Sequence, residues 1–310
     1  MRRLKVIVIL GPTATGKSDC GIMLAQKLGG EIISGDSMLV YKHMDIATAK
    51  PNARELAEIK HHLINILEPS EKFNVVDFKE RAALLIQDIN ARGHVPIIVG
   101  GTGLYIKALL ENYDFAQAQA VGNLRVDLEN YAIREGNQAL HRRLAKLDAN
   151  AAKNLHSNDR RRVIRAIEVA MQGEEVSQTH AKESPYDAIV FGLHMPREIL
   201  YPRINKRVDK MVEAGIFEET KKLLAMGVPE DAQAMKSIGY RQVLEYLHDE
   251  YDKSTCISKI KQATRNFAKR QFTWYKKMSY IHWIEVAEPP VPERYVAEML
   301  RVLEQKRKLR

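Results

Sequence analysis

The chain has 310 residues, of which 45% are hydrophobic, so it is long enough for a buried core and for about two domains. Its 48 lysines and arginines exceed its 39 aspartates and glutamates, and the net charge of +9 favours a polyanionic partner. No apolar stretch approaches the roughly 20 residues of a membrane span, so no membrane association is expected. The two cysteines lack metal-ligand spacing and predict reduced thiols in a cytoplasmic protein.

The first predicted strand is the β-branched run from Leu4 to Leu10, and helical spacing follows from Asp19 to Leu28. The turn between them has the phosphate-binding loop pattern, in which two glycines let successive N–H groups point inward. Lys17 adds a full charge, and the Ser18 hydroxyl offers a ligand to Mg²⁺. The alternative is a glycine-rich turn that only matches the pattern. We predict a di- or triphosphate site made of Gly11, Pro12, Thr13, Ala14, Thr15, Gly16, Lys17 and Ser18.

A second strand is predicted at residues 31–34, and it ends at Gly35-Asp36-Ser37. In an open parallel sheet the carboxyl ends of the strands line the ligand crevice, so Asp36 should face the same space as the phosphate loop. Asp36 is therefore the first candidate for catalysis. Its alternative role is to cap the following turn with its short side chain.

An amphipathic helix is predicted from Phe73 to Gly93, and a buried parallel strand follows at residues 95–99. Nucleoside-triphosphate hydrolases usually end this strand with an acidic residue that helps hold Mg²⁺. Here glycines and Thr102 follow instead, which disfavours a hydrolase. We interpret the glycine pair as permitting close approach of a substrate, with the Thr102 hydroxyl as a polar contact.

The segment 112–187 loses the β-branched runs and predicts a helical insertion. Four arginines stand within residues 160–165, and Arg161 and Arg165 would share one helical face with Arg162 beside them. Such a cluster suits phosphates or stacked bases. The alternative is a solvated face paired with Glu168, Glu174 and Glu175.

A strand at residues 188–193 is expected to rejoin the core, and Pro196 begins a further helix. That helix places Arg203 and Arg207 on one face, where they could complete a pyrophosphate clamp. They could equally pair with Asp209, Glu213 or Glu218.

Basic and aromatic residues alternate from Thr264 to Lys277. This pattern is typical of a surface for single-stranded nucleic acid, where rings stack on bases and cations hold phosphates. A core helix with one basic face predicts much the same pattern, so the sequence leaves both interpretations open.

Six segments together resemble one family, the bacterial tRNA dimethylallyltransferases, also called tRNA isopentenyltransferases. They appear in the family's order and span nearly the whole chain. They are GPTATGKS at 11–18, DSMLVYKHMDIATAKP at 36–51, GGTGLY at 100–105, NDRRRVIRAIEV at 158–169, IGYRQ at 238–242 and TRNFAKRQFTW at 264–274. Two departures are modest: Gly35 replaces a larger residue, and Ala47 replaces a glycine.

The resemblance implies an α/β fold with a P-loop, nucleotide-kinase-like parallel sheet core. The core would comprise residues 1–111 and 188–310, and the helical insertion at 112–187 would bind the tRNA anticodon stem-loop. It also implies transfer of a dimethylallyl group from dimethylallyl diphosphate to N6 of the adenosine 3′-adjacent to the anticodon, in tRNAs reading codons that begin with U.

For this reaction we predict Asp36 as general base, with Lys17, Thr102 and Arg207 as further catalytic residues and Mg²⁺ on Ser18. Arg203 would assist the phosphate loop. We expect the protein to act as a monomer. The predicted tRNA contacts are Asp36, Ser37, Met38, Leu39, Arg161, Arg162, Val163, Ile164, Arg165, Lys236, Ser237, Ile238, Gly239, Tyr240 and Arg241. The rival functions are a small-metabolite or nucleotide kinase with the same loop and a nucleotide-gated RNA-binding protein without transfer chemistry.

Overall fold

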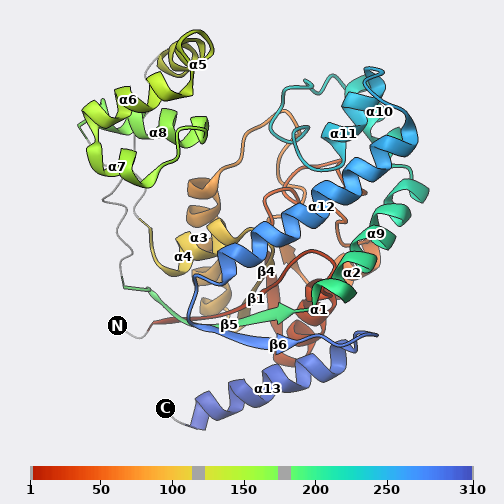
Figure 1. The fold of residues 1–310 in the computed structure, drawn as a ribbon. Helices are drawn as coiled ribbons and strands as arrows, with labels where there is room; N and C mark the ends of the chain where they lie inside the picture. The colour runs from red at the N-terminus through yellow and green to blue at the C-terminus, as the bar shows by residue number, and fades with distance from the viewer. Residues whose placement is uncertain (1–2, 114–122, 174–182, 309–310) are drawn as a thin grey trace. The chain divides into compact units, whose positions relative to one another are not determined.

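The computed structural model describes residues 3–113, 123–173 and 183–308. The chain divides into two compact units, one formed by Met1–Leu110 with Pro185–Arg310 and the other by Glu111–Ser184 (Figure 1). The first unit is built on a parallel sheet in the order β3-β2-β4-β1-β5-β6, which confirms the predicted α/β class. Its strands are β1 (Leu4–Leu10), β2 (Gly30–Ser34), β3 (His61–His62), β4 (Val95–Gly100), β5 (Tyr186–His194) and β6 (Ile281–Glu285).

Four of these strands were expected from β-branched runs, whereas the two edge strands β3 and β6 were not. The predicted start of β5 at residue 188 is wrong by two residues. Tyr186 and Asp187 already belong to the strand, because they pair in parallel with Leu4 and Lys5 of β1.

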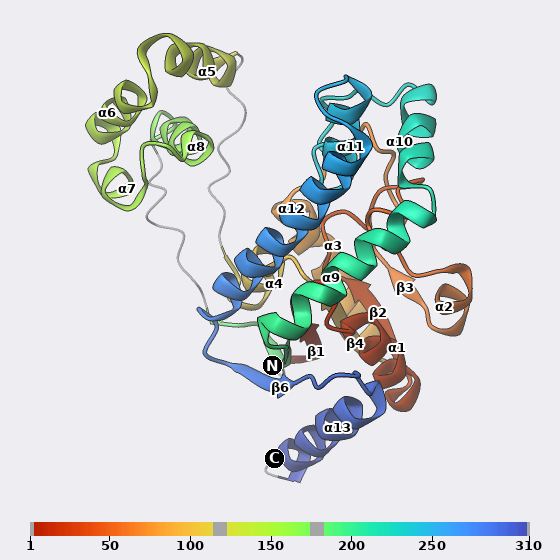
Figure 2. The ribbon, with the colours of Figure 1, turned by 45° about the vertical axis from the view of Figure 1, so that its right-hand side comes forward.

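The helices of the first unit cover both faces of the sheet (Figures 1 and 2). They are α1 (Lys17–Leu28), α2 (Ala53–Glu58), α3 (Val75–Ala91), α4 (Gly103–Leu110), α9 (Arg197–Glu213), α10 (Ile216–Ala225), α11 (Tyr240–Leu247), α12 (Lys253–Tyr275) and α13 (Pro292–Lys308).

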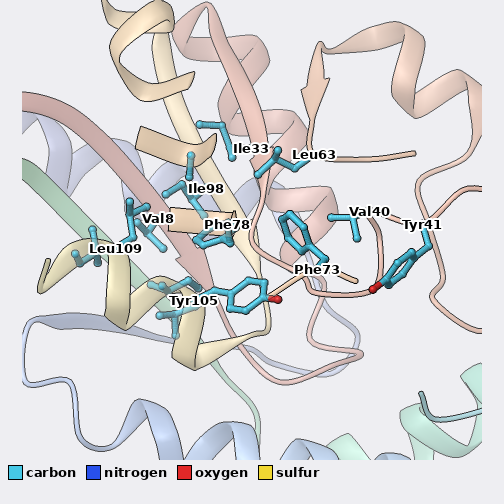
Figure 3. Close-up of a cluster of buried hydrophobic side chains, with 14 of the residues drawn as sticks. Val8, Ile33, Val40, Tyr41, Leu63, Phe73, Phe78, Ile98, Tyr105 and Leu109 are labelled. Atoms are coloured by element: carbon cyan, nitrogen blue, oxygen red, sulfur yellow. The ribbon is translucent and has the colours of Figure 1, made fainter. Parts of the chain in front are cut away.

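Successive side chains of β1 point to opposite faces of the sheet, so they pack into two separate layers of the core. Val6 and Val8 pack toward α3 and α4, whereas Ile7 and Ile9 pack toward α1 and α13. Figure 3 shows the first layer, in which Tyr105 of α4 lies against Phe78 of α3; the two rings stack at 4.7 Å between centroids. This stacking fixes the start of α4, directly after the segment that carries Thr102.

The second unit is helical and has its own core. Its helices are α5 (Leu124–Glu135), α6 (Asn137–Leu147), α7 (Ala149–Asn154) and α8 (Arg160–Ala170). The apolar face of α8 is buried with Leu140 and Leu144 of α6. Val163 and Ile164 belong to that face, so their side chains pack in the core of this unit, and their contact with tRNA stays a prediction.

The long helix α12 packs against α9 within the first unit, and the two helices lie side by side in Figures 1 and 2. Cys20 and Cys256 are buried and unbonded to each other. Among the described ranges, no helix combines the length and apolar character needed to cross a bilayer.

Candidate active site

A cavity of about 550 Å³ opens at the carboxyl edge of the sheet. Lys17 from the start of α1, Asp36 after β2 and Arg207 from α9 all line it, together with Thr13 and Ser18 of the phosphate loop. These residues come from distant parts of the chain. They meet because β1 and β2 flank β4 in a parallel sheet, so the segments that follow the strands emerge at the same edge.

The phosphate loop has the tight backbone that its sequence predicts. Gly16 has φ of 87° and Ala14 has φ of 68°, so the chain passes twice through the left-handed region. The buried Thr15 hydroxyl donates to the Pro12 carbonyl at 2.9 Å. Arg203 of α9 donates through Nε to the Ala14 carbonyl at 3.1 Å, so this predicted diphosphate ligand also braces the loop.

Two cations of the cavity, Lys17 and Arg207, have pKa values below their ordinary ones. Burial, with a smaller contribution from the charge of Arg207, lowers the pKa of Lys17 to about 8, although nearby Asp36 opposes the shift. Burial likewise lowers the pKa of Arg207, while Asp36 and Asp19 oppose that shift, and the guanidinium stays charged because its ordinary pKa is so high. A bound anion would relieve the repulsion between these cations.

A second cavity, of about 420 Å³, reaches the same phosphate loop. It shares Lys17, Ser18 and Arg207 with the first, and one face of α9 adds Arg203, Lys206 and Lys210 to its wall. The phosphate loop is therefore accessible from two directions, one of them strongly cationic.

Asp36 caps a turn and also lines the larger cavity, and its catalytic role stays a prediction. Its Oδ1 accepts a hydrogen bond from the Met38 N–H at 2.9 Å, which caps the turn after β2. The half-buried carboxylate also lines the cavity, where it can accept a proton from a bound molecule.

Thr102 ties neighbouring loops together. Its Oγ1 accepts from the Ser37 N–H at 3.1 Å, and its own N–H donates to the Gly35 carbonyl at 3.2 Å. It is not among the described residues that line the larger cavity. The structure thus places Thr102 beside the Asp36 turn, with its hydroxyl proton free of these two bonds.

The glycine pair at the end of β4 was interpreted as room for a substrate. Gly100 does line the larger cavity, and both glycines also allow close contacts within the protein. A Cβ at Gly100 would overlap the backbone of Gly35, and one at Gly101 would overlap the Gln271 side chain. These close approaches are between segments of the protein itself.

The family model described as IPP transferase matches residues 39–278, well over half of the chain. The chain belongs to the IPP transferase family. Curated relatives named tRNA dimethylallyltransferase include one from an Exiguobacterium species, 47% identical over 286 residues (92% of each chain). Another, from Carboxydothermus hydrogenoformans, is 48% identical over 286 residues, or 91% of this chain and 92% of the relative.

Solved structures agree with this assignment. A tRNA isopentenylpyrophosphate transferase from Bacillus halodurans aligns with a TM-score of 0.74 at 41% identity, over 99% of each chain. A eukaryotic dimethylallyltransferase, described as acting on tRNA, aligns with a TM-score of 0.83 at 30% identity, over 97% of this chain and 80% of the other.

In this IPP transferase the loop after Asp36 is held by charged side chains. The Glu219 carboxylate accepts from the Asp45 and Ile46 N–H groups, each at 2.9 Å. Lys50, whose side chain is 2% exposed, donates to the Tyr41 carbonyl at 2.8 Å and pairs with Asp45 at 2.6 Å. These contacts shape the wall of the cavity formed by residues 47–49.

Tyr240 is a further anchor of that wall. It is fully buried, and its hydroxyl donates to Glu219. The ring therefore faces the core and supports the loop through Glu219, and the contact of Tyr240 with tRNA stays a prediction. Its neighbour Gly239 has φ of 101° and leaves no room for a Cβ beside Ala47.

The other predicted tRNA residues of the first unit line the larger cavity. They are Ser37, Met38, Leu39, Lys236, Ser237, Ile238, Gly239 and Arg241. Sequence reasoning did not single out Asn266, Phe267 and Arg270 of α12, which line it as well. The segment 264–277 thus lies largely in a core helix, α12, that turns a basic and aromatic face into the site, and helical spacing could have found that face.

In the second unit, Arg161 and Arg162 are exposed at the start of α8, and Arg162 pairs with Asp159 at 3.3 Å. Arg165 lies 3.5 Å from Glu168. Glu168 is buried and held by both Nε and Nη2 of Arg125 at 2.8 Å, so its main partner lies outside the cluster. Glu174 and Glu175, the other proposed partners, lie outside the described residues.

Proposed function

We propose that this IPP transferase moves a dimethylallyl group from dimethylallyl diphosphate to N6 of the adenosine 3′-adjacent to the anticodon, in tRNAs reading codons that begin with U. The observation that carries the proposal is that the phosphate loop and the Asp36 carboxylate line one cavity. Relatives named tRNA dimethylallyltransferase support the donor and the acceptor.

The nucleophile is adenine N6, which is weak because its lone pair is delocalised into the ring. Asp36 lies where a carboxylate can accept the N6 proton as the bond to C1 of the dimethylallyl group forms. The bond between C1 and the diphosphate oxygen breaks, and its electron pair leaves with pyrophosphate. Thr102 does not line this cavity, so it would orient the amine only indirectly, by holding the turn that carries Asp36.

Pyrophosphate gains negative charge as it leaves, so preorganised donors and cations lower the barrier. The phosphate-loop amides, Lys17 and Arg207 would supply them at the cavity wall. Arg203 would hold the loop and contribute a further charge from the second cavity. That cationic opening suits entry of the diphosphate, while the larger cavity suits the nucleobase.

Ser18 would hold Mg²⁺ together with the donor's phosphates. Its side chain lines both cavities beside the phosphate loop, which fits this role. The described residues contain no cluster of three histidine, cysteine or carboxylate ligands, so most ligands would come from the diphosphate and water, as Mg²⁺ usually prefers. When bound, the ion would neutralise phosphate charge.

The target adenosine must leave its stack to enter the cavity. Lys236 and Arg241 at the cavity wall would hold the flanking phosphates, and Phe267 offers a ring for stacking. Arg161 and Arg162, exposed in the second unit, would bind the anticodon stem-loop. We expect a monomer that meets its tRNA in the cytoplasm.

The test is a mass spectrum of nucleosides from unmodified tRNA incubated with the protein, Mg²⁺ and dimethylallyl diphosphate, with ATP as a parallel donor. We expect an adenosine that gains one C5H8 unit with the allylic donor alone. Phosphate transfer from ATP would establish the kinase instead, and tRNA binding without any mass gain would establish the RNA-binding alternative.

A further inference from the structure

Two buried side chains of α12 reach across the carboxyl edge of the sheet. Gln271 is 4% exposed and Tyr275 is fully buried, and they stand one helical turn apart on the inner face of the helix. Both donate to the same acceptor: Gln271 Nε2 lies 2.9 Å and the Tyr275 hydroxyl 2.8 Å from the Gly101 carbonyl oxygen. The function proposed above uses neither side chain.

Each side chain also contacts the phosphate loop, Gln271 through its amide oxygen and Tyr275 through the same hydroxyl. The Thr13 N–H donates to Gln271 Oε1 at 3.0 Å, and the Tyr275 hydroxyl also lies 3.3 Å from the Gly11 carbonyl. Since the Thr13 amide can only donate and the Gly101 carbonyl can only accept, these partners fix the orientation of the Gln271 amide.

Gly101 leads directly to the loops that hold Asp36. Thr102 donates from its backbone to the Gly35 carbonyl at 3.2 Å and accepts from the Ser37 N–H at 3.1 Å. A continuous series of hydrogen bonds therefore runs from the phosphate loop, through Gln271 and Gly101, to both sides of Asp36.

The Gln271 amide lies close against the β4–α4 segment, because a Cβ at Gly101 would overlap it. A shift of the glutamine would lengthen or break its hydrogen bonds to Thr13 and Gly101 unless those segments moved with it.

We propose that Gln271, supported by Tyr275, is a positioning residue that sets the distance between the phosphate loop and Asp36. The proposal rests on the proposed function, in which the loop holds the leaving group and Asp36 takes the proton. Gln271 itself lines the larger cavity, but the contacts proposed for the leaving group and for the base are made by other residues. Loss of the connection should therefore reduce turnover, because misplacement by about 1 Å can cost about 100-fold, and should leave binding of the two substrates nearly unchanged.

The first test is Gln271→Met, which keeps the volume and removes both hydrogen bonds. We expect kcat to fall by about 10- to 100-fold while KM for each substrate changes by less than about threefold. Thr220→Val is the matched control, because it removes a buried hydroxyl that donates to Ile216 at 2.8 Å outside the site. It should lower the melting temperature and leave kcat unchanged. Wild-type kcat in Gln271→Met, or equal losses in both variants, would overturn the proposal.

The variant Gln271→Glu should show a pH dependence of kcat that is not expected if Gln271 only fills space. The new carboxylate can still accept from Thr13, but it repels the Gly101 carbonyl until it is protonated and can donate. Its kcat relative to wild type should therefore rise as pH falls from 8.5 to 6, while the ratio for Gln271→Met stays flat. A flat ratio for both variants would count against the proposal.

Amide hydrogen exchange tests this proposal without relying on enzymatic activity, so its result can be distinguished from a failure of the proposed function. In Gln271→Met, amides in residues 11–18 and 100–105 should both exchange faster, and in Thr220→Val neither segment should change. An inactive wild-type protein would refute the transferase while the exchange result still decided whether Gln271 couples the loops. Unchanged exchange in both segments would overturn the coupling.

Discussion

If the phosphate loop binds the donor as proposed, the lowered pKa of Lys17 should make that binding sensitive to pH. The ammonium is half-buried beside Arg207, and burial is the larger cause of the lowered pKa of about 8. At that value Lys17 is about nine-tenths protonated at pH 7 and about one-tenth protonated at pH 9. A bound diphosphate stabilises the charged form, so binding takes up a proton at high pH.

The direction and size of the effect follow from this linkage. A ligand that needs the protonated lysine binds more weakly as pH rises, and its Kd should increase about tenfold between pH 7 and pH 9. Most of the change should fall above about pH 7.5, because Lys17 is still about three-quarters protonated at that pH.

Calorimetric titration with pyrophosphate at pH 7, 8 and 9 measures this effect. Lys17→Arg is the control, because an arginine stays charged throughout and its Kd should respond only to the ionisation of pyrophosphate itself. Wild-type affinity that follows the same course as Lys17→Arg would refute the argument. Arg207→Met should move the wild-type transition to higher pH, since Arg207 helps lower the pKa of Lys17.

Three further predictions concern other charged residues. Asp36→Asn should lower kcat by about 100- to 10,000-fold with tRNA affinity unchanged, since the amide still caps Met38 but cannot take a proton. Glu31→Gln should cost about 3 kcal/mol in the free energy of unfolding at pH 7, because Arg92 and His62 hold the pKa of Glu31 near 2. Arg161→Gln should weaken tRNA binding and reduce its salt slope by about one.

Each of these has its own check. Steady-state kinetics test the Asp36→Asn prediction, with Asp231→Asn, a change at an exposed carboxylate, as the control. A wild-type kcat in Asp36→Asn would remove Asp36 from the mechanism. Urea unfolding measures the free energy of unfolding and so tests the Glu31→Gln prediction. The depressed pKa of Glu31 stabilises the fold above the ordinary value of 4.5 and loses its effect as pH falls toward 2, so a gap between wild type and Glu31→Gln that persists at pH 2 contradicts the linkage. For Arg161→Gln, an unchanged dependence of tRNA affinity on salt concentration would contradict the prediction.

Local patterns predicted the parts of the fold and site that depend on neighbours in sequence. The phosphate loop and Asp36 were found because each follows a β-branched strand, and the parallel sheet then brings the two together. The edge strand β6 was missed because only Ile281 and Ile284 of its five residues are buried, so it lacks a continuous apolar run.

The contacts that hold the site together could not be predicted in this way. Gln271 lies 258 residues from Thr13 and 170 from Gly101, so no local pattern links them. Motif membership also failed to separate side chains that face the ligand from those that face the core. Tyr240 stands beside Arg241 in one motif, yet only Arg241 lines the cavity.

The order of the strands explains why no acid follows β4. Because β4 lies between β2 and β1, the segment after it is enclosed by the Asp36 turn on one side and by α12 on the other. Any side chain at Gly100 would displace Gly35, and any at Gly101 would displace Gln271. An aspartate there, as in nucleoside-triphosphate hydrolases, would separate the phosphate loop from Asp36. Glycines at these two positions therefore keep the segments after β2 and β4 close to α12, a spacing that the proposed transfer from a diphosphate to a base requires. In that proposal most ligands of Mg²⁺ would come from the substrate.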